Sequence, residues 1–137
     1  RLKNTMDEQA FGTIITEKAS AGSFKAVAAK DSITAINIKS TRMLMAYGFL
    51  RKVFEIFETY KTPIDMITTS EVAVSLTIDQ DAQLPAIEQE LKKFGTISIE
   101  KNLTIICIVG HQIAEQKGSL KAVFDALGNT PVRMVSC

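Results

Sequence analysis

Apolar positions in the middle of the chain follow first a helical spacing and then a strand spacing. Five apolar residues recur as one stripe of a helix: Phe49, Leu50, Val53, Phe54 and Phe57. Residues 72–78 then alternate apolar with small or polar side chains, which is the period of a half-buried strand. A second helix is predicted over about 84–94, with Pro85 in its first turn and Gly95 as its C-terminal cap. We therefore expect helices and strands in one compact unit.

Shorter apolar segments supply the remaining strands of the predicted fold. Four of them are strand candidates, at 24–30, 33–39, 64–67 and 97–99. The first two flank Asp31 and Ser32, whose side chains favour turns, and they could pair as a hairpin. From residue 33 onward the order is strand, helix, strand, strand, helix, strand, which is that of a ferredoxin-like βαββαβ unit. This order predicts an α+β fold: an antiparallel sheet with both helices on one face and the other face free for a further subunit or domain.

An internal repeat extends this prediction to the rest of the chain. Ten positions are identical between the two copies: Thr34, Ile36, Ile38, Gly48, Leu50, Val53, Phe54, Thr62, Pro63 and Met66 match Thr104, Ile106, Ile108, Gly118, Leu120, Val123, Phe124, Thr130, Pro131 and Met134. The second copy stops at the counterpart of Thr69, so we expect it to be an incomplete module, completed either by residues beyond Cys137 or by a neighbour. The expected organisation is a tail and linker at 1–23, a first module at 24–101 and a partial second module at 102–137.

Composition excludes several classes of function. Lys and Arg number 16 against 15 Asp and Glu, so net charge gives no argument for binding nucleic acid or an anionic membrane. Cys107 and Cys137 do not form a disulfide framework, which favours a reducing, cytoplasmic location. His111 is the single histidine, so neither a metal site nor a catalytic triad is predicted. A small molecule or another protein is the expected partner.

Two stretches are expected to approach the start of the first helix, at 40–50 and 64–71. Helix N-termini present unpaired N–H groups and a positive dipole end, which suit a carboxylate, and Gly48 would let a ligand come close. Gly48 could equally be a turn residue before the helix. Asp65 interrupts an apolar strand and needs either a salt bridge to a nearby Lys or Arg or the ammonium group of a ligand. Ser70 and Glu71 could be simple turn residues.

Residues 40–79 closely resemble the first ACT domain of aspartate kinases, above all in the run ITTSEVAVSLTID, and are nearest to the monofunctional lysine-sensitive kind. Residues 105–136 look like the start of the family's second ACT domain, and residues 1–16 like the end of the amino-acid kinase domain. The resemblance implies that the catalytic lobe, with its ATP, Mg and aspartate, lies outside this chain. It therefore implies no catalytic residue, metal or cofactor within residues 1–137.

The resemblance also implies an effector site where two first ACT domains meet in a homodimer. Its residues would be Met43, Ala46, Gly48, Phe49, Leu50, Ile64 and Asp65, with Ser70 and Glu71 contributed across the interface. Asp65 would hold an ammonium group, and main-chain groups at 46–50 would hold the α-carboxylate. Arg133 replaces Asp65 in the second copy, which is expected to be structural. The implied function is feedback inhibition by lysine; the alternatives are threonine, as in a fusion with homoserine dehydrogenase, or a structural dimerisation module without a ligand.

Overall fold

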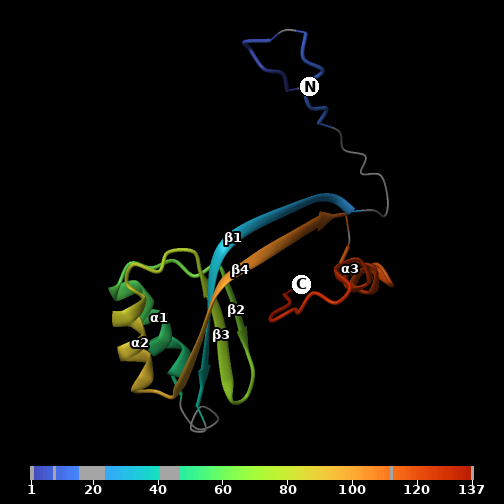
Figure 1. Cartoon of the computed structure of the whole chain (residues 1–137). Coiled ribbons are helices and arrows are strands. Elements are labelled where there is room, and N and C mark those ends of the chain that lie inside the picture. The colour runs from blue at the N-terminus through green and yellow to red at the C-terminus, as the bar shows by residue number, and fades with distance from the viewer. Residues whose placement is uncertain (1, 8, 16–23, 41–46, 112, 137) are drawn as a thin grey trace. The chain divides into compact units, whose positions relative to one another are not determined.

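A computed structural model describes residues 2–7, 9–15, 24–40, 47–111 and 113–136 of the chain. Four strands and three helices are assigned among them (Figure 1): β1 (Phe24–Lys39), α1 (Phe49–Thr59), β2 (Met66–Thr69), β3 (Ala73–Ile78), α2 (Leu84–Lys92), β4 (Thr96–Gly110) and α3 (Ser119–Leu127). No helix in these residues is both long and apolar enough to cross a membrane.

The strands form one antiparallel sheet in the order β2-β3-β1-β4. Thr34 of β1 lies opposite Ile78 of β3, and Lys39 lies opposite Ala73. Strand β2 pairs with the other edge of β3, where Met66 lies opposite Thr77. Helices α1 and α2 lie together on one face of the sheet (Figure 1). The predicted α+β architecture of the first module is confirmed.

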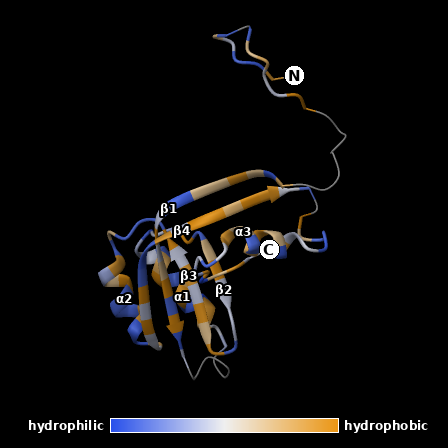
Figure 2. Cartoon of the chain, turned by 45° about the vertical axis from the view of Figure 1, so that its right-hand side comes forward, coloured by the Kyte–Doolittle hydropathy of each residue, from blue (hydrophilic) through white to orange (hydrophobic). Residues whose placement is uncertain are grey.

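The hydrophobic core lies between this sheet and its two helices. Val53 of α1 and both Ile87 and Leu91 of α2 are fully buried against strand residues of β1 and β3. The rings of Phe49 and Phe94 meet edge to face, with centroids 6.5 Å apart. In Figure 2 hydrophobic and hydrophilic positions alternate around α1 and α2, as expected for helices with one face in water. Of the stripe that the sequence predicted for α1, Phe49, Val53 and Phe57 are buried. Leu50 and Phe54 are 38% and 46% exposed, and Ile56 joins the buried face in their place.

The chain divides into two compact units, each made from two segments. The larger unit contains residues 28–107 and 129–137, and the smaller contains residues 1–27 and 108–128. Within the smaller unit, Leu2 and Thr13 exchange two main-chain hydrogen bonds of 2.8 Å. Its helix α3 begins after Gly118, and the Ser119 hydroxyl donates to the carbonyl of Ile113 at 2.6 Å. No residue of α3 is buried.

Two local predictions were wrong. Strand β1 runs without interruption through Asp31 and Ser32, so they form no hairpin; Ser32 takes a positive φ of 61° within the strand instead. Strand β4 likewise continues past Asn102, which has φ 58°. The sequence had suggested a separate strand on each side of Asn102, one in each module. A short polar side chain tolerates the left-handed conformation, so one such residue need not end the pairing.

Gly95 is not the left-handed cap that its position predicted. Helix α2 ends at Lys92, and the capping residue Lys93 has right-handed helical geometry. Gly95 does not have a positive φ, but a Cβ atom added to it would lie 2.3 Å from the carbonyl oxygen of Lys39. Glycine is needed at this position because β1 and the start of β4 approach closely there.

Candidate functional site

The start of α1 has no side-chain cap among the residues that the structure describes. Gly48 precedes the helix in the left-handed conformation, with φ 80° and ψ 11°, and no side chain caps the first turn. The first turn also carries no acidic residue, and no described residue lies within 4 Å of the place where a Gly48 Cβ would sit. The main-chain N–H groups of this turn are therefore suited to an incoming carboxylate. Phe49 is buried in the core, whereas Leu50 is 38% exposed.

The second copy of the repeat has the same left-handed glycine before its helix. Gly118 precedes α3 with φ 86° and ψ −2°, again without a side-chain cap. The match of Gly48 with Gly118 in the internal repeat thus corresponds to the same left-handed backbone conformation in both copies. Met43 and Ala46, which were predicted to line the site before Gly48, lie outside the described residues.

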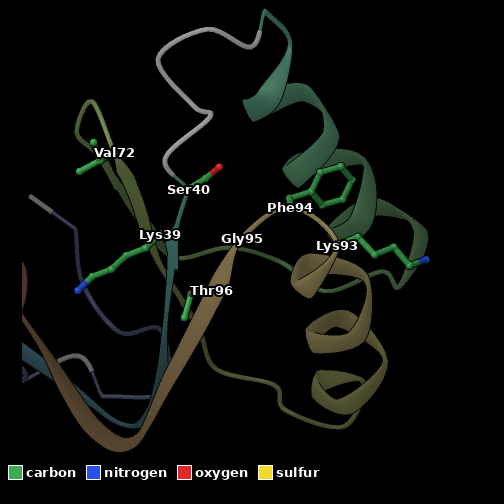
Figure 3. Close-up of a pocket in the computed structure, with 7 residues that line it drawn as sticks. All are labelled: Lys39, Ser40, Val72, Lys93, Phe94, Gly95 and Thr96. Carbon is green, nitrogen blue, oxygen red and sulfur yellow. The ribbon is translucent and has the colours of Figure 1, made fainter.

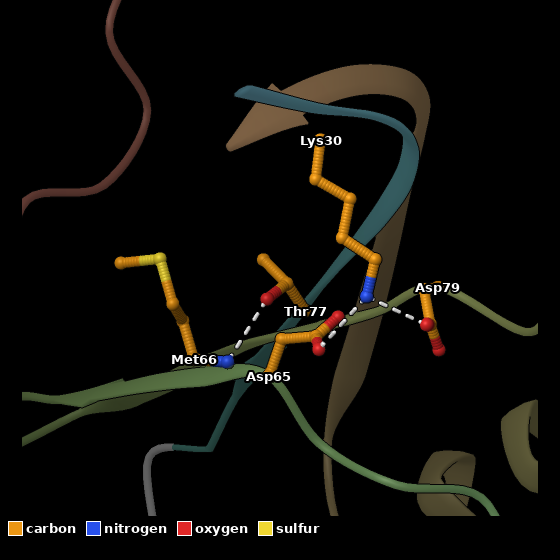
Figure 4. A network of polar contacts seen from close by, with 5 residues as sticks. All are labelled: Lys30, Asp65, Met66, Thr77 and Asp79. Carbon is orange, nitrogen blue, oxygen red and sulfur yellow. Dashed lines mark hydrogen bonds and ion pairs between the residues drawn. The ribbon is translucent and has the colours of Figure 1, made fainter. Parts of the chain in front are cut away.

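Asp65 lies at the entry to β2 and is fixed by the neighbouring strand (Figure 4). Its main-chain N–H donates to the carbonyl of Thr77 at 2.9 Å, and the next N–H, that of Met66, donates to the Thr77 hydroxyl at 3.1 Å. Ile64 packs against the core and is partly buried. The Asp65 carboxylate remains 27% exposed and forms an ion pair of 3.4 Å with the Lys30 ammonium. Of the two possibilities left open for Asp65, the salt bridge is the one present in the single chain.

Lys30 is shared between two carboxylates. Its ammonium lies 2.7 Å from Oδ2 of Asp79, closer than it lies to Asp65 (Figure 4). The Asp79 hydrogen bond is the main cause that raises the pKa of Lys30, with partial burial opposing it and Asp65 adding to it. The same hydrogen bond lowers the pKa of Asp79. The other oxygen of Asp79, Oδ1, is buried and has no hydrogen-bond partner among the described residues.

Ser70 closes the turn between β2 and β3. Its main-chain N–H donates to the carbonyl of Ala73 at 2.8 Å, and its hydroxyl accepts the Ala73 N–H at 3.2 Å. Glu71, the next residue, is exposed. Within one chain, Ser70 and Glu71 therefore act as turn residues, and the exposed Glu71 side chain could contact a second copy.

The strand register separates the predicted site residues. The N–H of Ser40, just after β1, donates to the carbonyl of Val72 at 2.9 Å, so β1 ends beside the β2–β3 turn. Ser70, Glu71 and the start of α1 therefore belong to one end of the sheet. Asp65, beside Thr77 near the end of β3, belongs to the other. The expectation that the whole of 64–71 approaches the start of α1 holds only for its second half.

Two of the hollows on the larger unit are lined by none of the predicted site residues that the structure describes. The first, of about 590 Å³, is lined by Lys39, Ser40, Val72, Lys93, Phe94, Gly95 and Thr96 (Figure 3). The ammonium groups of Lys39 and Lys93 point away from each other in Figure 3, so no charge converges on this hollow. The second, of about 280 Å³, is lined by Ala35, Ile36, Asn37, Lys39, Ser75, Ser98, Glu100, Arg133 and Met134. Its rim carries the ion pair of Arg133 with Glu100, at 2.8 Å.

Lys30 and Asp79 are the residues of this region that sequence reasoning missed. Asp79 directly follows an alternating strand, and Lys30 sits 35 residues before Asp65, so neither forms a local motif. Only the pairing of β1, β3 and β2 brings the three charges together. Among the described residues there is also no group of three or more His, Cys, Asp or Glu side chains that could hold a metal ion.

The sheet order, the two helices on one face and the glycine-led helix starts define a regulatory module of the ACT type. Comparison with known proteins agrees with this class. A C-terminal regulatory domain of aspartate kinase from Porphyromonas gingivalis W83 has a TM-score of 0.70 at 50% identity, covering 81% of this chain and 76% of its own. Escherichia coli aspartokinase III, solved with lysine and aspartate in the T-state, has a TM-score of 0.78 at 31% identity, covering 96% and 31%.

A comparison of sequences alone gives the same family. The aspartokinase of Candida albicans is 33% identical over 132 residues, which is 93% of this chain and 24% of the relative. No protein-family model matches the chain. The chain belongs to the aspartate kinase family and corresponds to its C-terminal regulatory region. It spans about a quarter of the length of the curated relatives that it matches.

Proposed function

We propose that this chain is the amino-acid-binding regulatory region of an aspartate kinase, and that its effector is lysine. The observation that carries the proposal is the likeness, over 96% of the chain, to an aspartokinase solved with lysine bound. The start of α1, without a side-chain cap, and the carboxylate of Asp65 supply the two opposite charges that a free amino acid needs. A carboxylate suits the first and an ammonium suits the second.

The site requires two copies of the chain. Strand β2 is at the edge of the sheet, and its two ends carry Asp65 on one side and Ser70 with Glu71 on the other. A two-fold axis at that edge would place the strands antiparallel, so that Asp65 of one copy faces Ser70 and Glu71 of the other. This arrangement reunites residues that the register separates within one chain. It supports effector binding at a homodimer interface.

Binding at an interface gives a route to feedback control. The parent kinase would transfer the γ-phosphoryl group of ATP to L-aspartate, forming 4-phospho-L-aspartate, with ATP and Mg held by a catalytic domain outside this chain. An effector that binds one dimer arrangement better than another shifts the population toward it. A coupling free energy of about 1–3 kcal/mol would change affinity by about 5- to 150-fold. Within the family, inhibition follows when the favoured arrangement is the less active one.

One observation favours a second candidate, a structural dimerisation module without a ligand. Asp65 already has a cationic partner in Lys30, and neither described hollow reaches it. A third candidate keeps the sensor but exchanges lysine for threonine, whose side chain carries no second ammonium. The three candidates differ in what they bind, so titration separates them.

Isothermal titration calorimetry of the chain with lysine and with threonine tests the proposal. We expect saturable binding of lysine that Asp65→Ala abolishes. The matched control is Asp81→Ala, because Asp81 is an exposed aspartate of the same module that pairs with Lys101 at 2.8 Å. This control should bind lysine as the wild type does. Binding of threonine alone would replace the effector, and no heat with either amino acid would favour the structural module.

A further inference from the structure

We propose that Lys30 is an internal competitor for the effector site, its side-chain ammonium occupying the carboxylate of Asp65 that the effector's ammonium must take. This inference rests on the proposed role of Asp65. It adds a residue of β1, Lys30, that sets the affinity of the site. It also adds Asp79, the residue directly after β3, which holds the Lys30 ammonium partly away from Asp65. Lys30 lies in β1, Asp65 directly precedes β2 and Asp79 directly follows β3, and their side chains meet at one end of the sheet (Figure 4).

The chemistry of the competitor matches that of the ligand. A lysine side chain ends in the same primary ammonium as free lysine, with three donors and one positive charge. Its Nζ atom lies 3.4 Å from Oδ1 of Asp65, at the outer range of an ion pair. An incoming ammonium would therefore displace a contact that is already long. With two carboxylates and one lysine, the cluster carries a net charge of −1 before the ligand arrives.

Asp79 determines how strongly Lys30 competes. The ammonium lies 2.7 Å from Oδ2 of Asp79, so its short contact is made there and not to Asp65. When the effector takes Asp65, Lys30 can stay on Asp79 and does not become an unpaired cation. Removing the Asp79 charge would leave Asp65 as the only carboxylate that pairs with Lys30. Asp79 thus acts on the effector through Lys30.

This arrangement predicts effects of opposite sign from the two partners of one ion pair. Lys30→Met removes the competing charge and keeps an unbranched side chain, so lysine should bind more tightly. Asp79→Asn should weaken lysine binding, because Lys30 then pairs with Asp65 alone. Exposed ion pairs are weak, so each change should be about two- to fivefold in Kd. Asp79→Asn should have no further effect when Lys30 is already Met.

Calorimetry with free lysine on the wild type, Lys30→Met, Asp79→Asn and the double variant tests the inference. The matched control is Lys101→Met, which removes a lysine of similar exposure that pairs with Asp81, and it should leave the Kd unchanged. Thermal unfolding of each variant shows that it is folded. If lysine binds the wild type and Asp65→Ala abolishes binding, but Lys30→Met binds no more tightly, the competition is disproved while the effector site stands.

Two further outcomes are equally decisive. An equal loss of affinity from Asp79→Asn with and without Lys30 would mean that Asp79 acts on the ligand directly, which overturns its role through Lys30. If neither the wild type nor Lys30→Met binds lysine or threonine, the proposed effector site itself fails, and the competitor with it. If only Lys30→Met binds, both the site and the competitor are supported.

Discussion

Lys30, Asp65 and Asp79 show how one cation can be shared unequally by two carboxylates. The contact to Asp79 is shorter by 0.7 Å, from 3.4 to 2.7 Å, and it is the larger cause of the raised pKa of Lys30. About half of the Lys30 side chain remains exposed, so solvent screens both contacts. The cluster is therefore better suited to exchanging partners than to stabilising the fold.

The pH dependence of this ion pair follows from the two pKa shifts. Asp79 has a pKa below its usual 3.8, so its contribution is present above that value and is lost as pH falls through the lower, folded-state pKa. Lys30 has a pKa above its usual 10.5, so its contribution is present below 10.5 and is lost as pH rises through the folded-state value. The difference in unfolding free energy between wild type and Asp79→Asn should be constant between these limits and decline outside them. Urea unfolding followed by circular dichroism at a series of pH values measures it; a difference that persists in strong acid would contradict the ion pair.

Gly48 and Gly95 are glycines for different reasons, and substitution separates them. Gly48 has a positive φ, and no described residue crowds its added Cβ, so Gly48→Ala should cost about 1 kcal/mol of unfolding free energy, and Gly48→Asn should cost less. Gly95 has no positive φ, but its added Cβ would meet the Lys39 carbonyl, so Gly95→Ala should cost about 1–3 kcal/mol. Asparagine at Gly95 should be worse than alanine. Urea unfolding of the four variants tests this, and a benefit from asparagine at Gly95 would show that conformation, and not space, is limiting.

At the scale of elements, the apolar residues of α1 and α2 differ in burial: some form the core and others stay exposed near the start of α1. Leu91 of α2 is fully buried in the core, whereas Leu50 of α1 is 38% exposed beside the open helix start. Leu91→Ala should therefore lower the free energy of unfolding by about 2–5 kcal/mol. Leu50→Ala should lower it by less than about 1 kcal/mol and should weaken effector binding instead. Urea unfolding and calorimetry on the same two variants check the division; a large loss of stability from Leu50→Ala would place it in the core.

The elements that could be predicted from sequence are those whose periodicity reflects burial. The stripe of Val53 and Phe57 and the alternation of Val74 and Leu76 predict α1 and β3 because the same residues form the core. The continuity of β1 through Ser32 could not be predicted in this way. Asp and Ser favour turns locally, but β1 continues past them as a strand of the sheet, so its pairing outweighs the cost of one residue at positive φ.

At the scale of the whole molecule, resemblance to a family proposes a set of site residues but does not give their arrangement. Resemblance to a family identifies Asp65, Ser70 and Glu71 together, because they are close in sequence. The strand register places them at opposite ends of β2, and the partner of Asp65 comes from β1. Such pairings depend on which strands are neighbours in the sheet, and one sequence does not reveal that order at single-residue resolution. The loop with Met43 and Ala46 lies outside the described residues, so those two stay predictions.

An effector site made by two copies has a thermodynamic consequence for the whole chain. If lysine binds only where Asp65 of one copy faces Ser70 and Glu71 of another, lysine and dimerisation must favour each other by the same free energy. Sedimentation equilibrium should therefore show a dimer that tightens as lysine is added, and lysine should bind more tightly as chain concentration rises. Asp65→Ala should abolish the lysine dependence while leaving dimerisation without ligand unchanged, since Asp65 pairs within its own chain when no ligand is present. Lysine binding that is independent of chain concentration would place the whole site within one copy. The strand register argues against that arrangement, because it puts Asp65 and Ser70 with Glu71 at opposite ends of β2.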